Sequence, residues 1–296
     1  QSRQDGVQWI ALPYVNYQDV LCAADPEAVS RDWDVVCTLG AHSMEYVSSR
    51  MQSSDADVRQ AMLDRLVPIG YPELDGLATI DRATVLKKYG LPTAKPIIFL
   101  STAPSYYRAY GGQGAVVGYE MRFRGWDAVP PHRWLNRLYT LHHAQMISYR
   151  QYLGALREMA DRNGAIIVAK TRTKHRDPRF LQSYCDYLFD DVTFYPFTTL
   201  ELASVSGLYF GFFSMAIVEA VAAGAYAITA KFAPIDEIAP PGASETATYL
   251  TACDTLGNTA GVSEVIDGMT PQGVARLTEI RHAPLSDFQV DAQQRH

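Results

Sequence analysis

The sequence has no uncharged apolar run that is long enough to form a membrane-spanning helix. Such a helix needs about 20 apolar residues, and the longest apolar segment, residues 206–229, carries Glu219 near its middle. The 296-residue chain also has no surplus of basic residues, since its formal net charge is −6. Nucleic-acid binding normally requires a basic face. These absences argue against a membrane-spanning protein and against nucleic acid as the main partner.

Cysteine is scarce, and none of the cysteines has the spacing of a metal site. The four residues are Cys22, Cys37, Cys185 and Cys253, and no two of them form a CxxC pair. Each lies in or beside an apolar segment, which predicts reduced, buried thiols in a cytoplasmic protein. No paired acidic motif is present to hold a divalent cation, so we expect no metal cofactor. The chain shows no signal peptide and no initiator methionine, and we expect further sequence before Gln1.

The longest apolar segment is predicted to form a strand, a helix and a second strand. Residues 208–212 are a continuous apolar run of strand length, as expected for a strand buried on both faces of a parallel sheet. Ser214 is expected to cap an alanine-rich helix over residues 215–223. Gly224 then supplies the left-handed position before a strand at residues 225–229.

The start of this helix is a candidate phosphate site. The amides near Phe213, Ser214 and Met215 are expected to point out of the carboxyl edge of the sheet, where anions bind. Glu219, about one and a half turns further on, is the one charge on an otherwise apolar helix. Two interpretations stay open: Glu219 faces solvent, as most charges do, or it faces a ligand.

The first quarter of the chain has the pattern of the closing part of a Rossmann-like lobe. Residues 7–15 and 34–39 are predicted strands with a charged connection between them, and a helix is expected over residues 41–50. Residues 67–75 are predicted to form a short strand that runs into a proline turn, a natural linker. Two strands are too few for an independently stable sheet domain, so we predict a partial N-terminal lobe over residues 1–76.

Residues 77–285 are predicted to form a complete second lobe with a parallel sheet, and residues 286–296 a polar tail. The predicted fold class is therefore α/β, with two Rossmann-like lobes. The expected strands of the second lobe cover residues 96–100, 165–169, 192–195, 208–212 and 225–229, and its expected helices cover residues 81–89, 145–162, 178–189, 198–205, 215–223 and 263–281.

Two further groups of residues are expected at the carboxyl edge of this sheet. Ser101 and Thr102 directly follow a buried strand, and small hydroxyl residues there suit a loop that faces phosphate. The next strand ends in a basic cluster that could hold a pyrophosphate by charge-assisted hydrogen bonds. A solvated basic surface is the alternative. The members of this cluster are Lys170, Arg172, Lys174 and His175.

Residues 106–143 have an unusual composition and are interpreted as an insertion. They are rich in tyrosine, tryptophan, arginine and histidine and contain few acidic residues. Aromatic and basic residues together suit sugars and lipid headgroups, which favours an acceptor-binding or membrane-surface loop. The alternative is a loop that covers its own lobe.

The order of these motifs resembles the donor-binding half of GT-B-fold transferases, over about residues 34–230. The families with the most similar order and spacing of motifs are the CDP-glycerol glycerophosphotransferases and the non-hydrolysing UDP-GlcNAc 2-epimerases. The resemblance implies a GT-B-like fold with a nucleotide donor bound to the second lobe. It is carried by VPIGYPELD (67–75), a helix that ends in KKYGLP (87–92), PIIFLSTAP (96–104), the basic cluster at 170–175 and TTLELASVSGLYFGFFSMAIVEAVAAGAYAIT (198–229).

The resemblance also implies roles for individual residues. It assigns phosphate contacts to the cluster at residues 170–175 and to the turn at Ser214, and donor-hydroxyl binding to Glu219. The turn of the first lobe that supplies the catalytic base in the family has no match here. His42 and Glu45, on the predicted helix after residue 40, are therefore the candidate catalytic residues.

The function implied by the resemblance is transfer of a glycosyl or glycerophosphate group from a nucleotide-diphosphate donor to a sugar or lipid-linked acceptor. Such a reaction belongs to the synthesis of cell-surface polysaccharide or teichoic-acid-like polymers. A sugar-nucleotide epimerase and a nucleotide-binding lobe without catalysis remain alternatives, although the insertion favours the transferase because an epimerase needs no acceptor. The expected location is cytoplasmic, with residues 106–143 as the segment that would contact the inner face of the membrane.

Overall fold

The computed structural model describes residues 8–11, 26–38, 40–51, 55–102, 149–171, 177, 179–190, 192–194, 198–212, 216–231, 262–268 and 270–288. The chain divides into two compact units, and among the described residues the division falls between Asp75 and Gly76. The described residues up to Asp75 belong to the first unit, and those from Gly76 onward belong to the second.

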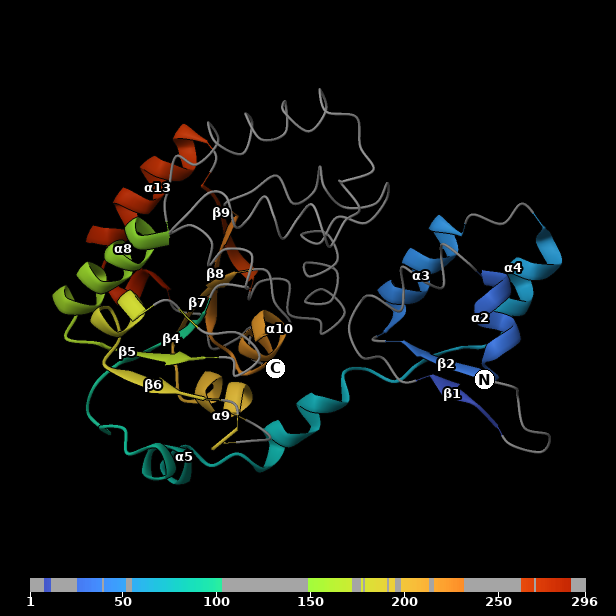
Figure 1. The fold of residues 1–296 in the computed structure, drawn as a ribbon, viewed down its shortest axis with the longest axis horizontal. Helices are drawn as coiled ribbons and strands as arrows, with labels where there is room; N and C mark the ends of the chain where they lie inside the picture. Colours follow the sequence, from blue (N-terminus) through green and yellow to red (C-terminus); the bar gives the residue numbers. More distant parts are fainter. Residues whose placement is uncertain are drawn as a thin grey trace. The chain divides into compact units, whose positions relative to one another are not determined.

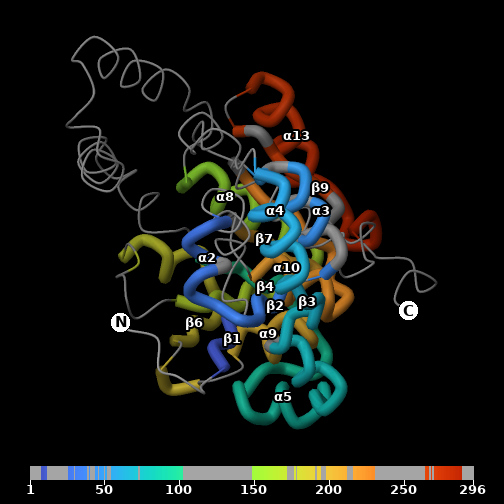
Figure 2. The backbone as a smooth tube through the Cα atoms, turned by 90° about the vertical axis from the view of Figure 1, so that its right-hand side faces the viewer, coloured from blue at the N-terminus to red at the C-terminus, as the bar shows by residue number. Residues whose placement is uncertain are grey.

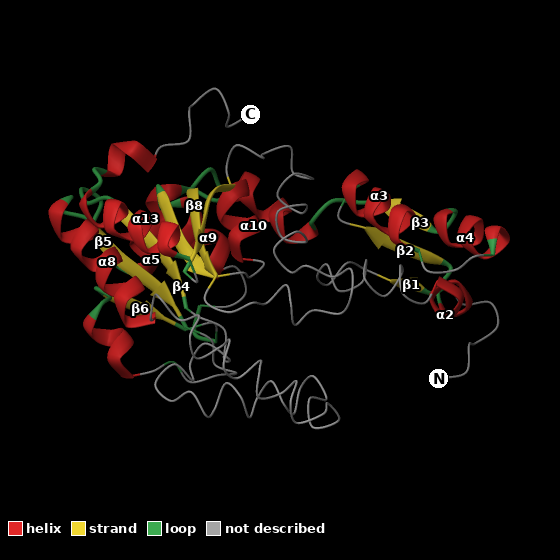
Figure 3. Cartoon of the chain, turned by 90° about the horizontal axis from the view of Figure 1, so that it is seen from above, coloured by secondary structure: helices red, strands yellow, loops and turns green. Residues whose placement is uncertain are grey.

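The first unit contains a parallel three-stranded sheet in the order β1-β2-β3 (Figures 1 and 3). The strand and helix predicted at residues 34–39 and 41–50 are confirmed, but the charged connection before them contains a helix, α2. A further helix, α4, is capped by the Asp55 carboxylate, which accepts from the amide of Asp57 at 2.8 Å. The elements are β1 Ile10–Ala11, α2 Pro26–Asp32, β2 Val35–Thr38, α3 Ala41–Arg50, α4 Ala56–Leu63 and β3 Leu66–Pro68.

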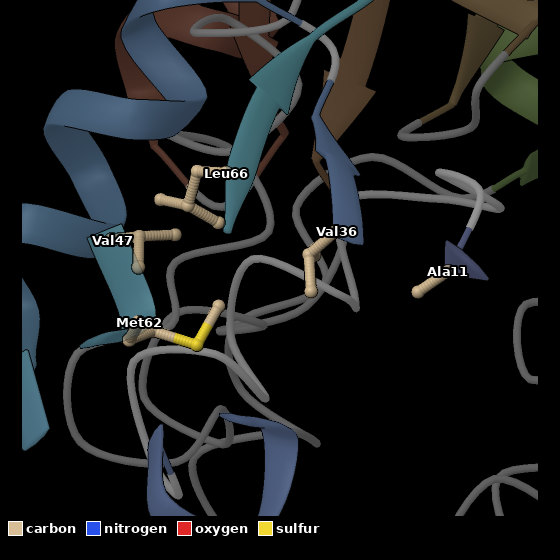
Figure 4. Close-up of a cluster of buried hydrophobic side chains, with 5 residues drawn as sticks. All are labelled: Ala11, Val36, Val47, Met62 and Leu66. Carbon is tan, nitrogen blue, oxygen red and sulfur yellow. The ribbon is translucent and has the colours of Figure 1, made fainter. Parts of the chain in front are cut away.

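A small apolar core holds these elements together. Figure 4 shows Val36 from β2, Val47 from α3, and Met62 and Leu66 from the α4–β3 segment pointing toward one another. Ala11 of β1 completes the cluster, and Val36, Val47 and Met62 are fully shielded from solvent. The two helices therefore pack on the sheet through a single apolar cluster.

The second unit contains a parallel six-stranded sheet in the order β6-β5-β4-β7-β8-β9. Numbered along the unit itself, this is the order 3-2-1-4-5-6 of the doubly wound dinucleotide-binding fold. The predicted α/β class with Rossmann-like parallel sheets is thus confirmed. The strands are β4 Ile97–Ser101, β5 Ile166–Lys170, β6 Tyr187–Phe189, β7 Leu208–Phe212, β8 Tyr226–Lys231 and β9 Val262–Asp267, and the α-helices are α5 Arg82–Tyr89, α8 Tyr149–Arg162, α9 Thr198–Ser204, α10 Ala216–Ala222 and α13 Pro271–His282.

Helices cover both faces of this sheet (Figure 3). On one face α9 contacts α10 and α5, and on the other α13 contacts α8. Neighbouring residues of β7 show the alternation between the faces, because successive strand residues point to opposite sides. The ring of Phe210 lies 4.8 Å from that of Tyr152 in α8, whereas Tyr209 is in register with Phe99 of β4 and packs against its ring at 5.6 Å.

The helix signals read from the sequence are confirmed at both ends of α5 and at the C-terminal end of α10. Asp81 caps α5, since its carboxylate accepts from the amide of Thr84 at 2.8 Å, and Gly90 ends the helix at a left-handed φ of 63°. Gly224 likewise takes a φ of 82° after α10. A short polar cap thus fixes the start of α5, and left-handed glycines follow the ends of both helices.

Two predicted elements of the second unit are wrong. Residues 178–189 do not form a helix, and the third strand is Tyr187–Phe189 rather than 192–195, where Val192–Phe194 forms a turn. Leu181, Cys185 and Leu188 have helical spacing, but Asp186 ties the segment to the sheet. Its amide donates to the Ile167 carbonyl at 2.9 Å, and its carboxylate accepts from the Ile167 amide at 2.8 Å.

The C-terminal part of the sheet also differs from the prediction. The expected helix over residues 263–281 begins only at Pro271, because Val262–Asp267 pairs with β8 as the edge strand β9. Phe288, which falls in the predicted polar tail, is buried against the ring of Tyr226 at 5.4 Å. Residues 286–288 therefore belong to the fold.

Candidate functional site

The carboxyl ends of β4 and β7 mark the point where the strand order of the sheet reverses. From β4 the chain continues outward to β5 and β6, and from β7 it continues in the opposite direction to β8 and β9. In open α/β sheets, ligands bind outside the carboxyl ends of the strands at such a switch point. Ser101 and Thr102 were predicted as phosphate-facing residues. Ser101 ends β4 at this point, Thr102 follows it, and both are largely buried.

Lys170 brings a cation to the same edge. It is the last residue of β5 and is in register with Ser101 of β4, so the two residues lie on the same face of the sheet. Its ammonium group donates to the hydroxyl of Thr199 at 2.8 Å. Thr199 lies in the first turn of α9 and is buried, whereas Lys170 is half-buried. The structure therefore places a cation and hydroxyl groups together beside the switch point.

The helix that carries Thr199 is anchored to α5 by charged and aromatic contacts. The Glu201 carboxylate accepts from the Lys88 ammonium at 2.6 and 2.8 Å and from the Tyr89 hydroxyl. Burial and the hydrogen bond to Glu201 raise the pKa of Tyr89, so this hydroxyl stays a donor at neutral pH. At the other end of α9, Arg82 donates to the Val205 carbonyl at 2.7 Å. Figures 1 and 2 both show α5 beside α9.

Tyr209 is the second residue of β7 and lies on the same face of the sheet as Lys170. Its ring runs along its own strand, and a Cβ atom at Gly211 would overlap the Tyr209 hydroxyl. Glycine at position 211 therefore makes room for the tyrosine. Thr229 of β8 is in register with Gly211 and is fully buried, and its hydroxyl has no hydrogen-bond partner among the described residues.

Glu219 lies on α10, which covers this face of the sheet. The other residues of the helix from Ala216 to Val221 are buried, while Glu219 is half-buried. The structure therefore places the carboxylate at the margin of an apolar surface. Both interpretations of Glu219, as a surface residue and as a ligand contact, remain compatible with that position.

Several candidate residues fall elsewhere or outside the described part of the chain. Glu45 is exposed on α3 of the first unit, and His42 lies in the same helix. Sequence reasoning missed Thr199, Tyr209 and Gly211, since only the folded chain brings them to the edge that carries Lys170. The candidates that lie outside the described residues are Arg172, Lys174, His175, Phe213, Ser214 and Met215, together with the insertion at 106–143.

Two further observations concern metals and membranes. Within the described ranges, no three or more His, Cys, Asp or Glu side chains are grouped so that they could hold a metal ion. The helices in the described part of the chain include none with the length and apolarity required to span a bilayer.

The described cysteines, Cys37 and Cys185, are free thiols, and burial raises the pKa of Cys185 to about 12.

Comparison with known proteins gives structural similarity at low sequence identity. No protein-family model matches the chain, and no curated protein sequence matches it. Two structures of the wall teichoic acid polymerase TagF align over 94% of this chain, with TM-scores of 0.43 and 0.42 and identities of 14% and 13%. WaaG, a glycosyltransferase involved in lipopolysaccharide biosynthesis, aligns over 86% with a TM-score of 0.31 and 14% identity. The chain spans 56% and 57% of the TagF chains and 58% of WaaG.

Proposed function

We propose that the chain binds the diphosphate of a nucleotide-activated donor at the carboxyl edge of the six-stranded sheet. The observation that carries the proposal is the pairing of Ser101 with Lys170 beside the switch point between β4 and β7. A half-buried ammonium group and a hydroxyl group on the same face suit a charged oxygen ligand. The three further basic residues that follow within five positions, Arg172, Lys174 and His175, would extend this charge.

The reaction we propose is transfer of a glycosyl or glycerophosphate group from that donor to an acceptor hydroxyl. Lys170 would stabilise the negative charge that develops on the departing nucleotide, which is the usual task of cations fixed at a transferring phosphate. Protein groups rather than a metal would supply this charge. His42 and Glu45 are the proposed candidates for proton removal from the acceptor.

The proposed setting is the synthesis of a cell-surface polysaccharide or teichoic-acid-like polymer. The acceptor would be a sugar or a lipid-linked chain, and residues 106–143 would provide contacts to it or to the cytoplasmic face of a membrane. Their aromatic and basic composition supports this part of the proposal.

Isothermal titration calorimetry with CDP, UDP and GDP tests the binding step. At least one of the three is expected to bind the wild-type chain with a Kd below about 1 mM, which corresponds to about 4 kcal/mol of binding free energy. Lys170→Met should weaken that binding about 10- to 100-fold, because a hydrogen bond to a charged group contributes roughly 1.5–3 kcal/mol. Addition of EDTA should leave the affinity unchanged.

The matched control is Lys87→Met, which removes an exposed lysine from α5. This variant should bind the nucleotide as the wild type does. Failure of all three nucleotides to bind at millimolar concentration would overturn the proposed function, as would a Lys170→Met variant that binds normally. Affinity that disappears in EDTA would show that the site depends on a metal.

A further inference from the structure

Thr199 fixes the position of the Lys170 ammonium group by a short hydrogen bond. The distance from Nζ of Lys170 to Oγ1 of Thr199 is 2.8 Å, well within the range of a strong hydrogen bond. Thr199 is only 6% exposed, so its hydroxyl is held in the protein interior. Lys170 carries four rotatable methylene groups, and a lysine side chain without such a contact samples many rotamers.

The position of Thr199 is itself set by contacts on both sides. The hydroxyl of the preceding residue, Thr198, donates to the Phe194 carbonyl at 2.8 Å. Two residues further on, Glu201 binds Lys88 and Tyr89 of α5. The first turn of α9 is therefore held at one place against the end of β5, and the acceptor for Lys170 is held with it.

The contact with Thr199 orients the ammonium group of Lys170 without supplying a countercharge. An ammonium group has three N–H donors, and the Thr199 hydroxyl takes one of them without neutralising the charge. A carboxylate in the same place would form an ion pair and reduce the attraction for an anion. A hydroxyl group is thus suited to orient a lysine that serves an oxyanion.

We infer that Thr199 is a positioning residue, which acts through Lys170 to set the affinity for the diphosphate of the donor. The inference rests on the proposed function, because it requires Lys170 to contact that diphosphate. Thr199 does not itself contact the ligand. Its effect on binding is therefore expected only where Lys170 is present.

A double-mutant cycle tests this dependence. The probe is whichever of CDP, UDP and GDP binds the wild-type chain most tightly, and the readout is its Kd by calorimetry. Thr199→Val should weaken binding about 3- to 10-fold, the range expected for loss of one hydrogen bond. Thr199→Ser, which keeps the hydroxyl, should bind within about twofold of the wild type. In the Lys170→Met background, Thr199→Val should have no further effect.

A matched control and a second variant separate positioning from a loss of structure. Thr278→Val removes a hydroxyl that donates to the Val274 carbonyl at 3.1 Å in α13, and it should leave nucleotide affinity unchanged. Where Thr199→Val fails to fold, Thr199→Ala takes its place in the same cycle.

The possible results separate a failure of the role assigned to Thr199 from a failure of the proposed nucleotide binding. A wild-type chain that binds none of the nucleotides defeats the proposed function, and the role of Thr199 falls with it. A wild-type chain that binds, with a Thr199→Val variant that binds equally well, defeats the inference alone. Equal losses from Thr199→Val with and without Lys170 would also overturn it, because they would show an effect that does not pass through the lysine.

Discussion

The two faces of the six-stranded sheet are built in similar ways but differ in what they present at the carboxyl edge. The face under α9 and α10 carries Lys170 at the end of β5, where it donates to Thr199 of α9, and Tyr209 within β7. The face under α8 is apolar at the corresponding point, where Tyr152 packs on Phe210. Burial raises the pKa of Tyr152, whose hydroxyl donates to the Gly211 carbonyl at 3.1 Å. One face thus ends in a cation bonded to a buried hydroxyl group, whereas the other is packed by aromatic rings.

The ion pairs that anchor the outer helices allow a direct comparison of the faces. Glu201 binds Lys88 on the α9 side, and Glu264 of β9 binds Arg276 of α13 on the α8 side. The side chains of Glu201 and Glu264 are both 15% exposed, and their partners are 37% and 40% exposed. The two glutamates are equally buried but lie on opposite sides of the sheet, so they form a matched pair for comparison. Variants of either should have similar effects on stability and different effects on ligand binding.

The largest expected difference between the faces concerns Glu219 of α10. Glu219→Gln keeps the shape of the side chain and removes its charge. Because the carboxylate is expected to accept hydrogen bonds from donor hydroxyls, donor affinity should fall about 10- to 100-fold, with the melting temperature nearly unchanged. Calorimetry with the donor nucleotide sugar or nucleotide glycerol and a thermal melt measure the two quantities. The control is Glu158→Gln on α8, where Glu158 lies 3.4 Å from Arg281 and is half exposed. Unfolding of the Glu219 variant, or unchanged donor binding, would make Glu219 a structural or surface residue.

Gly211→Ala should cause the next largest effect, by disturbing the packing at the end of β7. A Cβ atom at this position overlaps the Tyr209 hydroxyl, and the Tyr209 ring is fully buried between strands and helices. We expect a loss of about 1–3 kcal/mol in the free energy of unfolding, as for other overpacked sites. Urea denaturation measures the loss. The companion variant Gly154→Ala, in α8, has open space around the added atom and should not destabilise the protein. Equal stability of Gly211→Ala and the wild type would contradict the geometry of the Tyr209 ring.

The matched glutamates should give a smaller effect on stability. Glu201→Gln and Glu264→Gln should each lower the free energy of unfolding by about 1 kcal/mol, since their partners are partly exposed to solvent. Only Glu201→Gln should also weaken nucleotide binding, because α9 carries Thr199. Denaturation and calorimetry on the same two proteins provide the comparison. Equal losses of affinity in both variants would show that the two faces do not differ as proposed.

The smallest expected effect is a pH dependence on the α8 side. Burial opposes ionisation of Asp186, but hydrogen bonds from Arg157 and from the Ile167 amide lower the pKa of Asp186 below its usual range. A carboxylate with a lowered pKa stabilises the fold above its unfolded pKa of about 3.9 and loses that contribution as the pH falls through the folded pKa.

Asp186→Asn should therefore flatten the decline in stability below about pH 4. The change should be less than about 1 kcal/mol, because solvent screens this partly exposed pair. Urea midpoints measured between pH 3 and pH 7 test the difference, and nucleotide affinity at pH 7 should not change. An identical pH profile for the variant and the wild type would exclude the assigned role of Asp186.

The sequence alone predicted the centre of the sheet well and its edges poorly. Residues 208–212 form the predicted strand, because an apolar run of this length bounded by turn residues suits a strand buried on both faces. The edge strand β6 was mistaken for part of a helix, since Leu181, Cys185 and Leu188 have helical spacing. Its pairing depends on Asp186 and Ile167, which lie far apart in the sequence.

The candidate site was predicted in part: its strand-end residues could be placed, but the contacts between distant residues could not. Ser101 and Lys170 could be placed at the carboxyl edge, because each directly follows a predicted strand of a parallel sheet. Thr199 could not be connected with Lys170, since they are 29 residues apart and no local pattern signals the contact. The anchoring of α9 by Lys88 depends on a separation of 113 residues. Tertiary contacts of this kind leave no trace in hydrophobic periodicity.

The strand order also determines how the chain is exposed while it is being synthesised. β4 lies between β5 and β7, and Ile98, Phe99 and Leu100 are completely buried in the finished sheet. β5 is made soon enough to pair with one side of β4, but the other side waits for residues 208–212 to leave the ribosome. An apolar strand with an open edge is a template for association with other chains. Nascent chains that end between β5 and β7 are therefore expected to expose one edge of β4.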